Sequence, residues 1–167
     1  MRHHHVIESI TDAARLAESF EELGNGIAGA LRAIVPLDRM NIGLIDPGSY
    51  IFTDVYVTGR NVQGRTVGHR RTLADTVVEA GMNAGGGIVI GDEPPARLAE
   101  HFPRLQSTLD TGIRSMLTVT LESECETVAA LVLASTCQSA YTNDDLEMVR
   151  GVGAAIVDRI VALRNDL

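Results

Sequence analysis

The fold of this chain is decided by two neighbouring runs, Ile113-Arg-Ser-Met-Leu-Thr-Val-Thr-Leu121 and Thr127-Val-Ala-Ala-Leu-Val-Leu-Ala-Ser135. Both have the length of a strand and are rich in Val, Leu and Thr, which pack well on a pleated sheet. The segment between them, Glu122-Ser-Glu-Cys-Glu126, is short and polar. We therefore expect an antiparallel hairpin in this part of the chain.

A long amphipathic helix should follow the hairpin. From Thr142 onward the apolar residues recur at alternating intervals of three and four, which is the spacing of one helical stripe. These residues are Leu146, Val149, Gly153, Ile156, Ile160, Leu163 and Leu167. A hairpin and a helix of this kind need further strands to complete the sheet that the helix covers.

The residues before the hairpin alternate between helical and strand patterns. Gly24, Gly26 and Gly29 interrupt one helical pattern, so we expect tight packing or a bend there. The expected helices are residues 4–18, Ser19 (with Glu22 in a capping box) to Pro36, Thr72 (capped with Asp75) to Ala80, and a short helix after Pro94 interrupted near Pro103. The expected strands are Met40–Ile45, Tyr50–Thr58, Arg65–Arg71 and Ile88–Ile90.

The order and spacing of these segments resemble a GAF domain. Gly112-Ile-Arg-Ser115, the hairpin and the acidic helix start are similar to the C-terminal half of that family. Asp38–Asp46 is similar to its first strand, and Thr72–Gly81 followed by Gly87–Asp92 is similar to its middle helix and short strand. GAF domains are small sensory modules of signalling kinases, phosphodiesterases and transcription activators, and the fold hosts many functions.

The resemblance implies an α/β (α+β) fold with a central antiparallel sheet of about six strands. The N- and C-terminal helices would cover one face, and the middle helices and loops would enclose a cavity on the other. We expect a single GAF-like domain over residues 1–167, in which residues 1–5 are a tag remnant or disordered. His3, His4 and His5 therefore carry no functional interpretation.

Composition excludes several functional classes. The 167 residues carry a net charge of −8, which argues against a nucleic-acid surface and hence against a nucleic-acid partner. No apolar run approaches the roughly 20 residues that span a bilayer, and no signal peptide is visible, so we expect a cytoplasmic protein with no membrane partner. Cys125 and Cys137 would lie near opposite ends of one strand, so we expect free thiols.

Strand alternation assigns residues to the cavity. Asn41, Gly43 and Ile45 form the smaller and more polar face of their strand, so we place them toward the cavity. The same alternation selects further residues in the hairpin. The segments that the resemblance places over the sheet supply the remaining residues of the set. The candidate ligand-binding residues are Asn41, Gly43, Ile45, His69, Arg71, Thr76, Met82, Phe102, Met116, Thr118, Thr120, Val132 and Ala134. The alternative is that Met82, Phe102 and Leu105 simply fill the space.

Known activities of the family can be compared with this sequence. Phytochrome-like members attach a bilin through a cysteine, but neither Cys125 nor Cys137 is suitably placed, so no covalent bilin is expected. Free methionine sulfoxide reductases use cysteines around the middle loop, and residues 81–111 contain none. The Asn-Lys…Phe…Asp-Glu pattern of cyclic-nucleotide-binding members is also missing. The sequence assigns no catalytic residue and no metal ligand, and it leaves the cofactor unknown.

The non-terminal histidines leave three further hypotheses open. His69 or His101 would be the axial ligand of a haem, as in haem-sensing members of the family. His69 with Arg70 and Arg71 would alternatively hold an anion, although a solvated strand edge explains the same residues. A small enzyme built on His69, Arg71, Asp75 or His101 is the competing class.

The terminal helices are candidates for a homodimer interface. A second apolar row, Met148, Val152, Ala155 and Val161, gives the last helix more than one apolar side. The expected interface residues are Val6, Ile10, Leu146, Val149, Ile156, Ile160 and Leu163. The alternative is a helix that is widely buried within its own domain.

The sequence thus predicts a non-catalytic sensory domain that binds a small molecule of unknown identity and signals through its terminal helices. It would belong to a histidine kinase or a transcription activator, or act alone on a partner. The alternative is a structural dimerisation module with a filled cavity.

Overall fold

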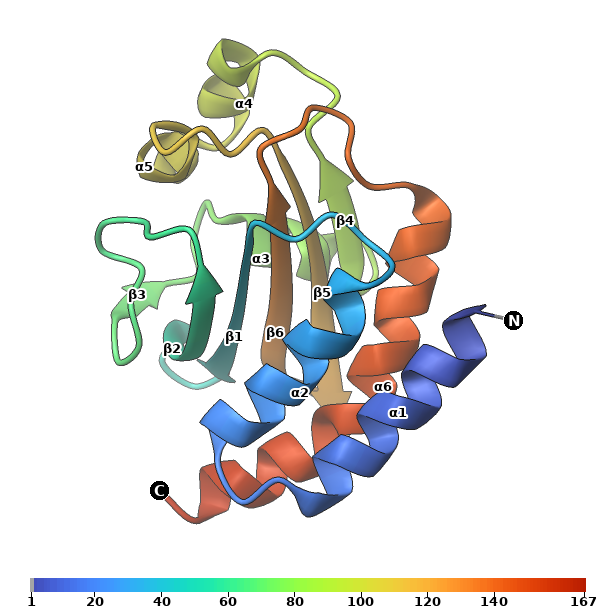
Figure 1. The fold of residues 1–167 in the computed structure, drawn as a ribbon. Helices are drawn as coiled ribbons and strands as arrows, with labels where there is room; N and C mark the ends of the chain where they lie inside the picture. The colour runs from blue at the N-terminus through green and yellow to red at the C-terminus, as the bar shows by residue number, and fades with distance from the viewer. Residues whose placement is uncertain (1) are drawn as a thin grey trace.

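The computed structural model describes residues 2–167 and contains three layers (Figure 1). The middle layer is a sheet of six strands. Helices α1 (Arg2–Leu16), α2 (Phe20–Arg32) and α6 (Asn143–Asn165) cover one face. The other face carries α3 (Val77–Asn83), α4 (Pro95–His101), the 3-10 helix η1 (Pro103–Leu105) and α5 (Gln106–Leu109). The α+β architecture predicted from the sequence is confirmed.

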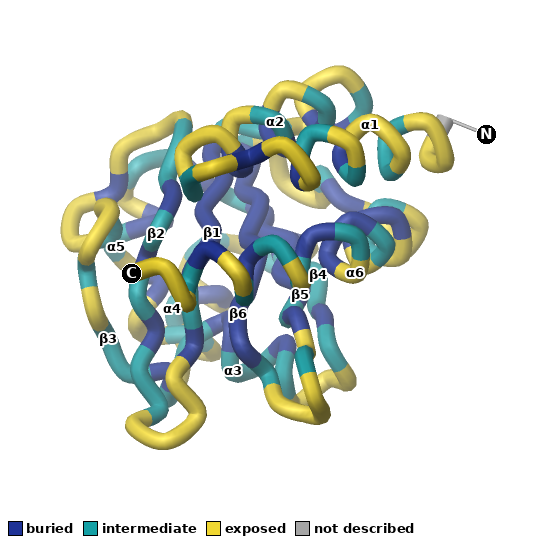
Figure 2. Tube along the Cα trace, turned by 90° about the horizontal axis from the view of Figure 1, so that it is seen from below, coloured by how far each residue is buried: buried dark blue, intermediate teal, exposed yellow. Residues whose placement is uncertain are grey.

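Each strand of the sheet is antiparallel to its neighbours. The order across the sheet is β3-β2-β1-β6-β5-β4. The bounds are β1 (Arg39–Asp46), β2 (Ile51–Gly59), β3 (Arg70–Thr72), β4 (Gly87–Ile90), β5 (Ser115–Ser123) and β6 (Glu126–Ser135). The middle strands are buried on both sides, and Figure 2 shows them in dark blue beneath the exposed outer turns of the helices.

The predicted hairpin is β5–β6, and its turn is tighter than the five-residue segment expected. Glu124 and Cys125 alone connect the strands, with φ of 51° and 67°. Two successive left-handed residues are the requirement of a type I′ turn, whose twist matches that of the flanking strands. Cys125 therefore lies exposed at the tip of the hairpin, and both Cys125 and Cys137 are free thiols.

The predicted stripe on α6 packs against the sheet. Thr142 caps the helix in a complete capping box with Asp145, which fixes its first turn. Five of the seven proposed dimer residues are buried within this single chain: Ile10, Val149, Ile156, Ile160 and Leu163. These five side chains belong to the chain's own core and are not available to a partner. Val6 and Leu146 are partly buried against the same core.

Three local predictions need correction. Gly64 and Gly68 have positive φ of 73° and 88°, so most of the strand expected over Arg65–Arg71 is a loop. The middle helix begins at Val77 because Asp75 adopts a φ of 64° and Thr76 is the cap. Glu22 accepts a hydrogen bond from the amide of Glu18 and not from Ser19, although Ser19 caps α2.

The N-terminal residues also differ from expectation. His3, His4 and His5 are exposed and helical within α1, whereas disorder was one of the two expectations for residues 1–5; Met1 lies outside the described residues. In residues 2–167 no helix combines the length and hydropathy that a membrane span requires.

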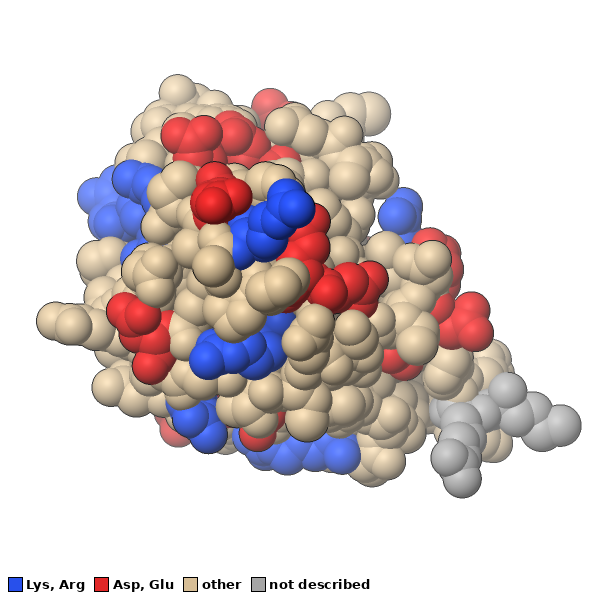
Figure 3. All heavy atoms as spheres, turned by 90° about the horizontal axis from the view of Figure 1, so that it is seen from above, with Lys and Arg blue, Asp and Glu red and all other residues tan. Residues whose placement is uncertain are grey.

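Figure 3 views the molecule from the end where α4 and α5 lie and shows acidic and basic side chains interspersed there.

The tight packing expected in α2 is found at Gly24. A Cβ atom built on Gly24 would lie 2.3 Å from the ring of Tyr56, whose hydroxyl donates to Asn25 Oδ1 at 2.8 Å. Gly29 lies in the same helix, and a Cβ there would meet no atom within 4 Å. The two glycines therefore form a matched pair for substitution.

Gly24→Ala should lower the free energy of unfolding by roughly 1–3 kcal/mol, because the new methyl group overpacks the Tyr56 ring. Gly29→Ala should raise it by about 0.5–1 kcal/mol, since alanine loses less backbone entropy in a helix. Urea unfolding of both variants measures the difference. Equal effects of the two substitutions would contradict the packing described here.

Candidate functional site: a cavity lined by arginines

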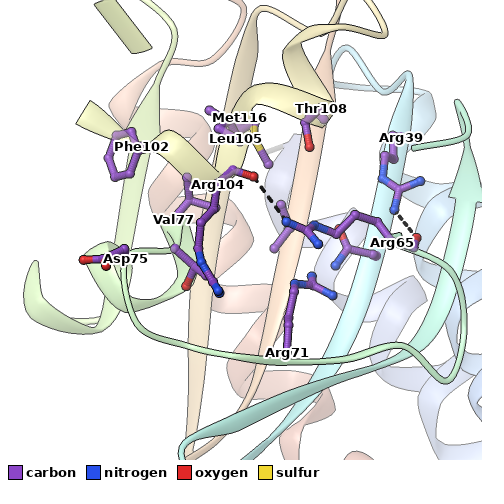
Figure 4. A pocket seen from close by; sticks show the side chains of 14 residues that line it. Arg39, Arg65, Arg71, Asp75, Val77, Phe102, Arg104, Leu105, Thr108 and Met116 are labelled. Atoms are coloured by element: carbon purple, nitrogen blue, oxygen red, sulfur yellow. Dashed lines mark hydrogen bonds between the residues drawn. The ribbon is translucent and has the colours of Figure 1, made fainter. Parts of the chain in front are cut away.

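A cavity of about 50 Å³ lies between the sheet and the segments opposite α1, α2 and α6. Figure 4 shows the side chains around it. Two of the lining residues, Asp75 and Arg104, are exposed, so the cavity reaches the surface. The complete lining is Arg39, Asn41, Arg65, Arg71, Asp75, Thr76, Val77, Phe102, Arg104, Leu105, Thr108, Met116, Val132 and Ala134.

One buried carboxylate, that of Asp54, contacts two residues of this lining. The Asp54 side chain is fully buried, and its Oδ2 lies 2.6 Å from Arg71 Nη1. Its Oδ1 accepts a hydrogen bond from Asn41 Nδ2 at 3.1 Å. The Arg71 guanidinium also lies 4.7 Å from the centroid of the Phe52 ring, within the range of a cation–π contact. Asp54 is thus both neutralised and hydrogen-bonded, as a buried carboxylate requires.

A bulge in β2 brings Asp54 to this face. The β1–β2 register shifts between Ile42 and Gly43, where Tyr56 and then Asp54 are the partners. In a regular strand residues 54 and 56 would face the same side. The extra residue, Val55, lets Tyr56 pack against the helices while Asp54 lies on the opposite side of the sheet, where it contacts Asn41 and Arg71 of the lining.

The other three arginines are held by backbone carbonyl groups. Arg39 is 5% exposed and donates to the carbonyl oxygens of Arg60 and Arg65 at 2.8 and 2.6 Å. Arg65 donates to the carbonyl of Arg104 at 3.2 Å, and Arg104 to that of Thr72 at 3.1 Å. These bonds connect β1, the loop before β3 and η1 around one space.

The positive charges of the cavity are only partly balanced. Within residues 2–167, Arg71 alone of the four has a carboxylate within 4.0 Å. Burial lowers the pKa of Arg39, Arg71 lowers it further, and Asp54 acts in the opposite direction. Burial and the charge of Arg71 also lower the pKa of Arg65. Guanidinium groups nevertheless keep their charge at neutral pH, so the site is cationic.

The opposite side of the cavity is apolar. Val77 from α3, Leu105 from η1 and Met116 from β5 are each less than a tenth exposed. Val132 and Ala134 on β6 form the floor. The cavity therefore combines a cationic wall with an apolar wall, which is the composition of many small-molecule sites.

Seven of the thirteen residues proposed as ligand-binding line this cavity: Asn41, Arg71, Thr76, Phe102, Met116, Val132 and Ala134. Gly43 and Ile45 face the same side but lie outside the lining, with Gly43 covered by the Phe52 ring. Met82 packs against the core of this side. Thr120 lines a separate hollow near Gly86 and Arg150.

The remaining proposed residues have other surroundings. Thr118 is buried near Gly81, and its hydroxyl has no hydrogen-bond partner within the described structure. His69 is half-buried, and its carbonyl accepts a hydrogen bond from the amide of Asp54. His101 is exposed and lies 3.0 Å from a Glu93 oxygen. Neither histidine belongs to the cavity lining, so the structure does not unite them with Arg71 and Asp75.

The ligand-binding residues proposed from the sequence did not include Arg39, Arg65, Asp75, Val77, Arg104, Leu105 and Thr108. Of these, Leu105 was expected only as a residue that fills the space, and Asp75 only in the competing enzyme hypothesis. Arg39 shares the alternation of Asn41 and Gly43, so extending that face by one step would have found it. Arg65 lies in a loop and Arg104 in a short 3-10 helix. No periodicity marks either position.

Comparisons with known proteins agree with this architecture. Residues 14–160 match the model of the GAF domain, so the chain belongs to the GAF domain family. A comparison of the sequence with curated proteins finds no match.

Solved structures of several proteins share the fold. The GAF domain of a phosphoenolpyruvate-protein phosphotransferase from Coxiella burnetii aligns with a TM-score of 0.77 at 15% identity, over 99% of this chain and 96% of that one. The GAF domain of a two-component sensor histidine kinase from Bacillus halodurans aligns with a TM-score of 0.73 at 16% identity, over 89% and 97%. Free methionine-R-sulfoxide reductase from Neisseria meningitidis, solved with its substrate, aligns with a TM-score of 0.75 at 17% identity, over 99% and 92%. The fold thus occurs both in signalling proteins and in an enzyme.

Removing the Asp54 carboxylate should show how much the stability of the fold depends on this side chain. Asp54→Leu leaves the Arg71 charge and the Asn41 amide without their partner, so we expect a loss of roughly 3–5 kcal/mol in the free energy of unfolding. The double variant Asp54→Leu/Arg71→Met should lose less, because it removes both charges. Urea unfolding compares the two. A double variant that is less stable than the single one would contradict this account.

Proposed function

We propose that this chain is a non-catalytic sensory domain that binds a small molecule in the arginine-lined cavity and transmits binding to its terminal helices. The observation that carries the proposal is a group of charged side chains converging on a cavity in an otherwise apolar core. Arg39 is buried and Arg65 half-buried, and neither has a carboxylate within 4.0 Å in the described residues. Unpaired charge in such surroundings costs free energy, which a ligand of opposite charge would offset.

The family supports a regulatory role. Among the structural neighbours are GAF domains of a sensor histidine kinase, a phosphoenolpyruvate-protein phosphotransferase and a cyanobacterial phytochrome. We place this chain in the same broad class, either within a longer signalling protein or acting on a separate partner. The free, exposed thiols Cys125 and Cys137 are consistent with a cytoplasmic location, where disulfides are rare.

Helix α3 provides a route from the cavity to α6. Thr76 lines the cavity and caps the start of α3, where its hydroxyl oxygen accepts from the Glu79 amide at 3.2 Å. At the other end, the carbonyl of Gly85 accepts a hydrogen bond from Arg150 on α6 at 3.2 Å. Two residues further along the chain, Gly87 lies so close to α6 that a Cβ atom there would be 2.9 Å from Leu146 Cδ1. A ligand that prefers one position of α3 would therefore favour one position of α6, which is a population shift.

The proposal of a non-catalytic role rests on the chemistry of the cavity. The two histidines of the competing enzyme hypothesis lie outside the lining, as do the two cysteines. The Thr76 hydroxyl is occupied as a helix cap and as a donor to the Leu73 carbonyl. The arginines are suited to binding an anion and not to abstracting a proton, because they stay protonated.

Ligand binding can be tested by native mass spectrometry and thermal shift against a library of neutral, cationic and anionic metabolites. We expect a bound small molecule or a library member that raises the melting temperature of the wild-type protein. Ala134→Leu should abolish that effect, because the longer side chain occupies the cavity floor. Thr120→Val, on the same sheet face outside the cavity, should retain it.

Two results would contradict the sensory proposal. One is a folded wild-type protein that carries no small molecule and responds to none in the library. The other is binding that persists unchanged in folded Ala134→Leu. We also propose a homodimer, formed through residues other than the five that are buried in the core of the chain. The same native spectra report the oligomeric state, and a bare monomer would contradict the homodimer.

A further inference from the structure

We propose that the ligand of this cavity is a small organic dianion, with its charged groups at the arginines and a short apolar part against Val77, Leu105 and Met116. This inference rests on the proposed sensory function and specifies the chemistry of the molecule sensed. It is carried by the number, the position and the free hydrogen-bonding capacity of the arginines.

The net charge of the side chains around the cavity predicts the charge of the ligand. Four guanidinium groups surround the cavity, and the neighbouring carboxylates are Asp54, paired with Arg71, and Asp75 in the lining. Full ionisation leaves a surplus of two positive charges. Like charges gathered in a partly desolvated space repel one another more strongly than in water. A ligand with two negative charges would balance the surplus, whereas a neutral ligand would leave the repulsion in place.

The donors are positioned before any ligand arrives. A guanidinium has five N–H groups, and Arg104 uses one of its donor nitrogens on the Thr72 carbonyl. Arg65 reaches the carbonyls of Gly64 and Arg104. Figure 4 shows Arg65, Arg71 and Arg104 entering the space from three different segments. Because backbone carbonyls orient Arg65 and Arg104, and Asp54 orients Arg71, much of the ordering cost of binding is already met.

The geometry favours oxygen anions that accept paired hydrogen bonds. Carboxylates and phosphates match the planar fork of arginine, and bonds between such ionised groups are about twice as strong as neutral ones. Asn41 adds a further polar side chain on the sheet, although its Nδ2 already donates to Asp54. The ligand is therefore a dicarboxylate or a phosphomonoester, which present the same anionic oxygens.

The apolar wall distinguishes an organic anion from an inorganic one. Val77, Leu105 and Met116 bring three largely buried side chains to the same cavity. Inorganic phosphate would leave this wall against water, whereas a short carbon chain would cover it and gain apolar burial. The modest volume of about 50 Å³ restricts the ligand to a compact molecule unless the covering segments move.

Matched ligand series test the inference by calorimetry on the wild-type protein. The anions are linear dicarboxylates of three to six carbons, glycerol phosphate and inorganic phosphate; the diamides and diamines of the same chain lengths are the neutral and cationic counterparts. We expect at least one organic dianion to bind at least ~10-fold more tightly than its diamide and than inorganic phosphate, since a charge-assisted pair is worth about one to two decades in affinity. Binding should weaken as salt is added.

Charge-matched variants locate the effect. Arg65→Gln and Arg104→Gln should each weaken binding of that dianion by about 10-fold or more, because each removes one charged partner. Arg70→Gln is the control, since Arg70 lies in the same strand as Arg71 but is exposed and outside the lining. The control should change affinity less than about 2-fold, because Arg70 lies outside the cavity lining and its exposed charge interacts only weakly with a ligand there.

The outcomes separate this inference from the sensory proposal. Binding of a neutral or cationic molecule that Ala134→Leu abolishes, with no organic dianion bound, would overturn the dianion and leave the sensor intact. Equal affinity for inorganic phosphate and organic dianions would overturn the organic ligand. If Arg70→Gln weakened dianion binding as much as Arg104→Gln does, the dianion would not be bound in the arginine-lined cavity, and the proposed site would be wrong. No binding by any molecule of the series or the library would remove both proposals.

Discussion

The buried pair between Asp54 and Arg71 is the interaction on which the cavity side of the molecule depends. It joins β3, an edge strand of only three residues, to the neighbouring strand β2, and Asn41 extends the link to β1. The pair uses the only carboxylate placed within 4.0 Å of the four arginines in the described residues. The remaining cations are consequently held by carbonyl oxygens, which orient them without neutralising them. The electrostatic character of the cavity follows from this one pairing.

The architecture could be predicted from the sequence because its signals are local and repeated. The hairpin strands are two apolar runs of strand length separated by a short polar segment, and the α6 stripe recurs over six turns of a helix. The same reasoning misplaced the start of the middle helix. Thr72 and Thr76 both offer a capping hydroxyl, and only the positive φ of Asp75 decides between them. The sequence also did not decide what α6 packs against. A helix with a wide apolar surface can pack against a partner or against the sheet of its own domain, and here the stripe packs against the sheet.

The candidate site was less accessible to sequence reasoning. Alternation placed Asn41, Met116 and Val132 on the correct face, because a strand exposes every second residue to the same side. It could not find Asp54, since the bulge at Val55 breaks the alternation. Arg65 and Arg104 lie in segments without a repeating pattern, and they come together only through the tertiary fold. The charged half of the cavity is thus a product of long-range packing.

The connection between α3 and β4 has a consequence for exchanging parts among proteins of this fold. Gly85 and Gly86 have φ of 86° and 113°, and a Cβ on Gly87 would lie 2.9 Å from Leu146 Cδ1. Side chains at these three positions would be strained or would collide with α6. A chimeric protein that borrows this cavity must therefore inherit the three glycines together with the α6 segment around Leu146. These residues form one transferable unit, although they lie far apart in the chain.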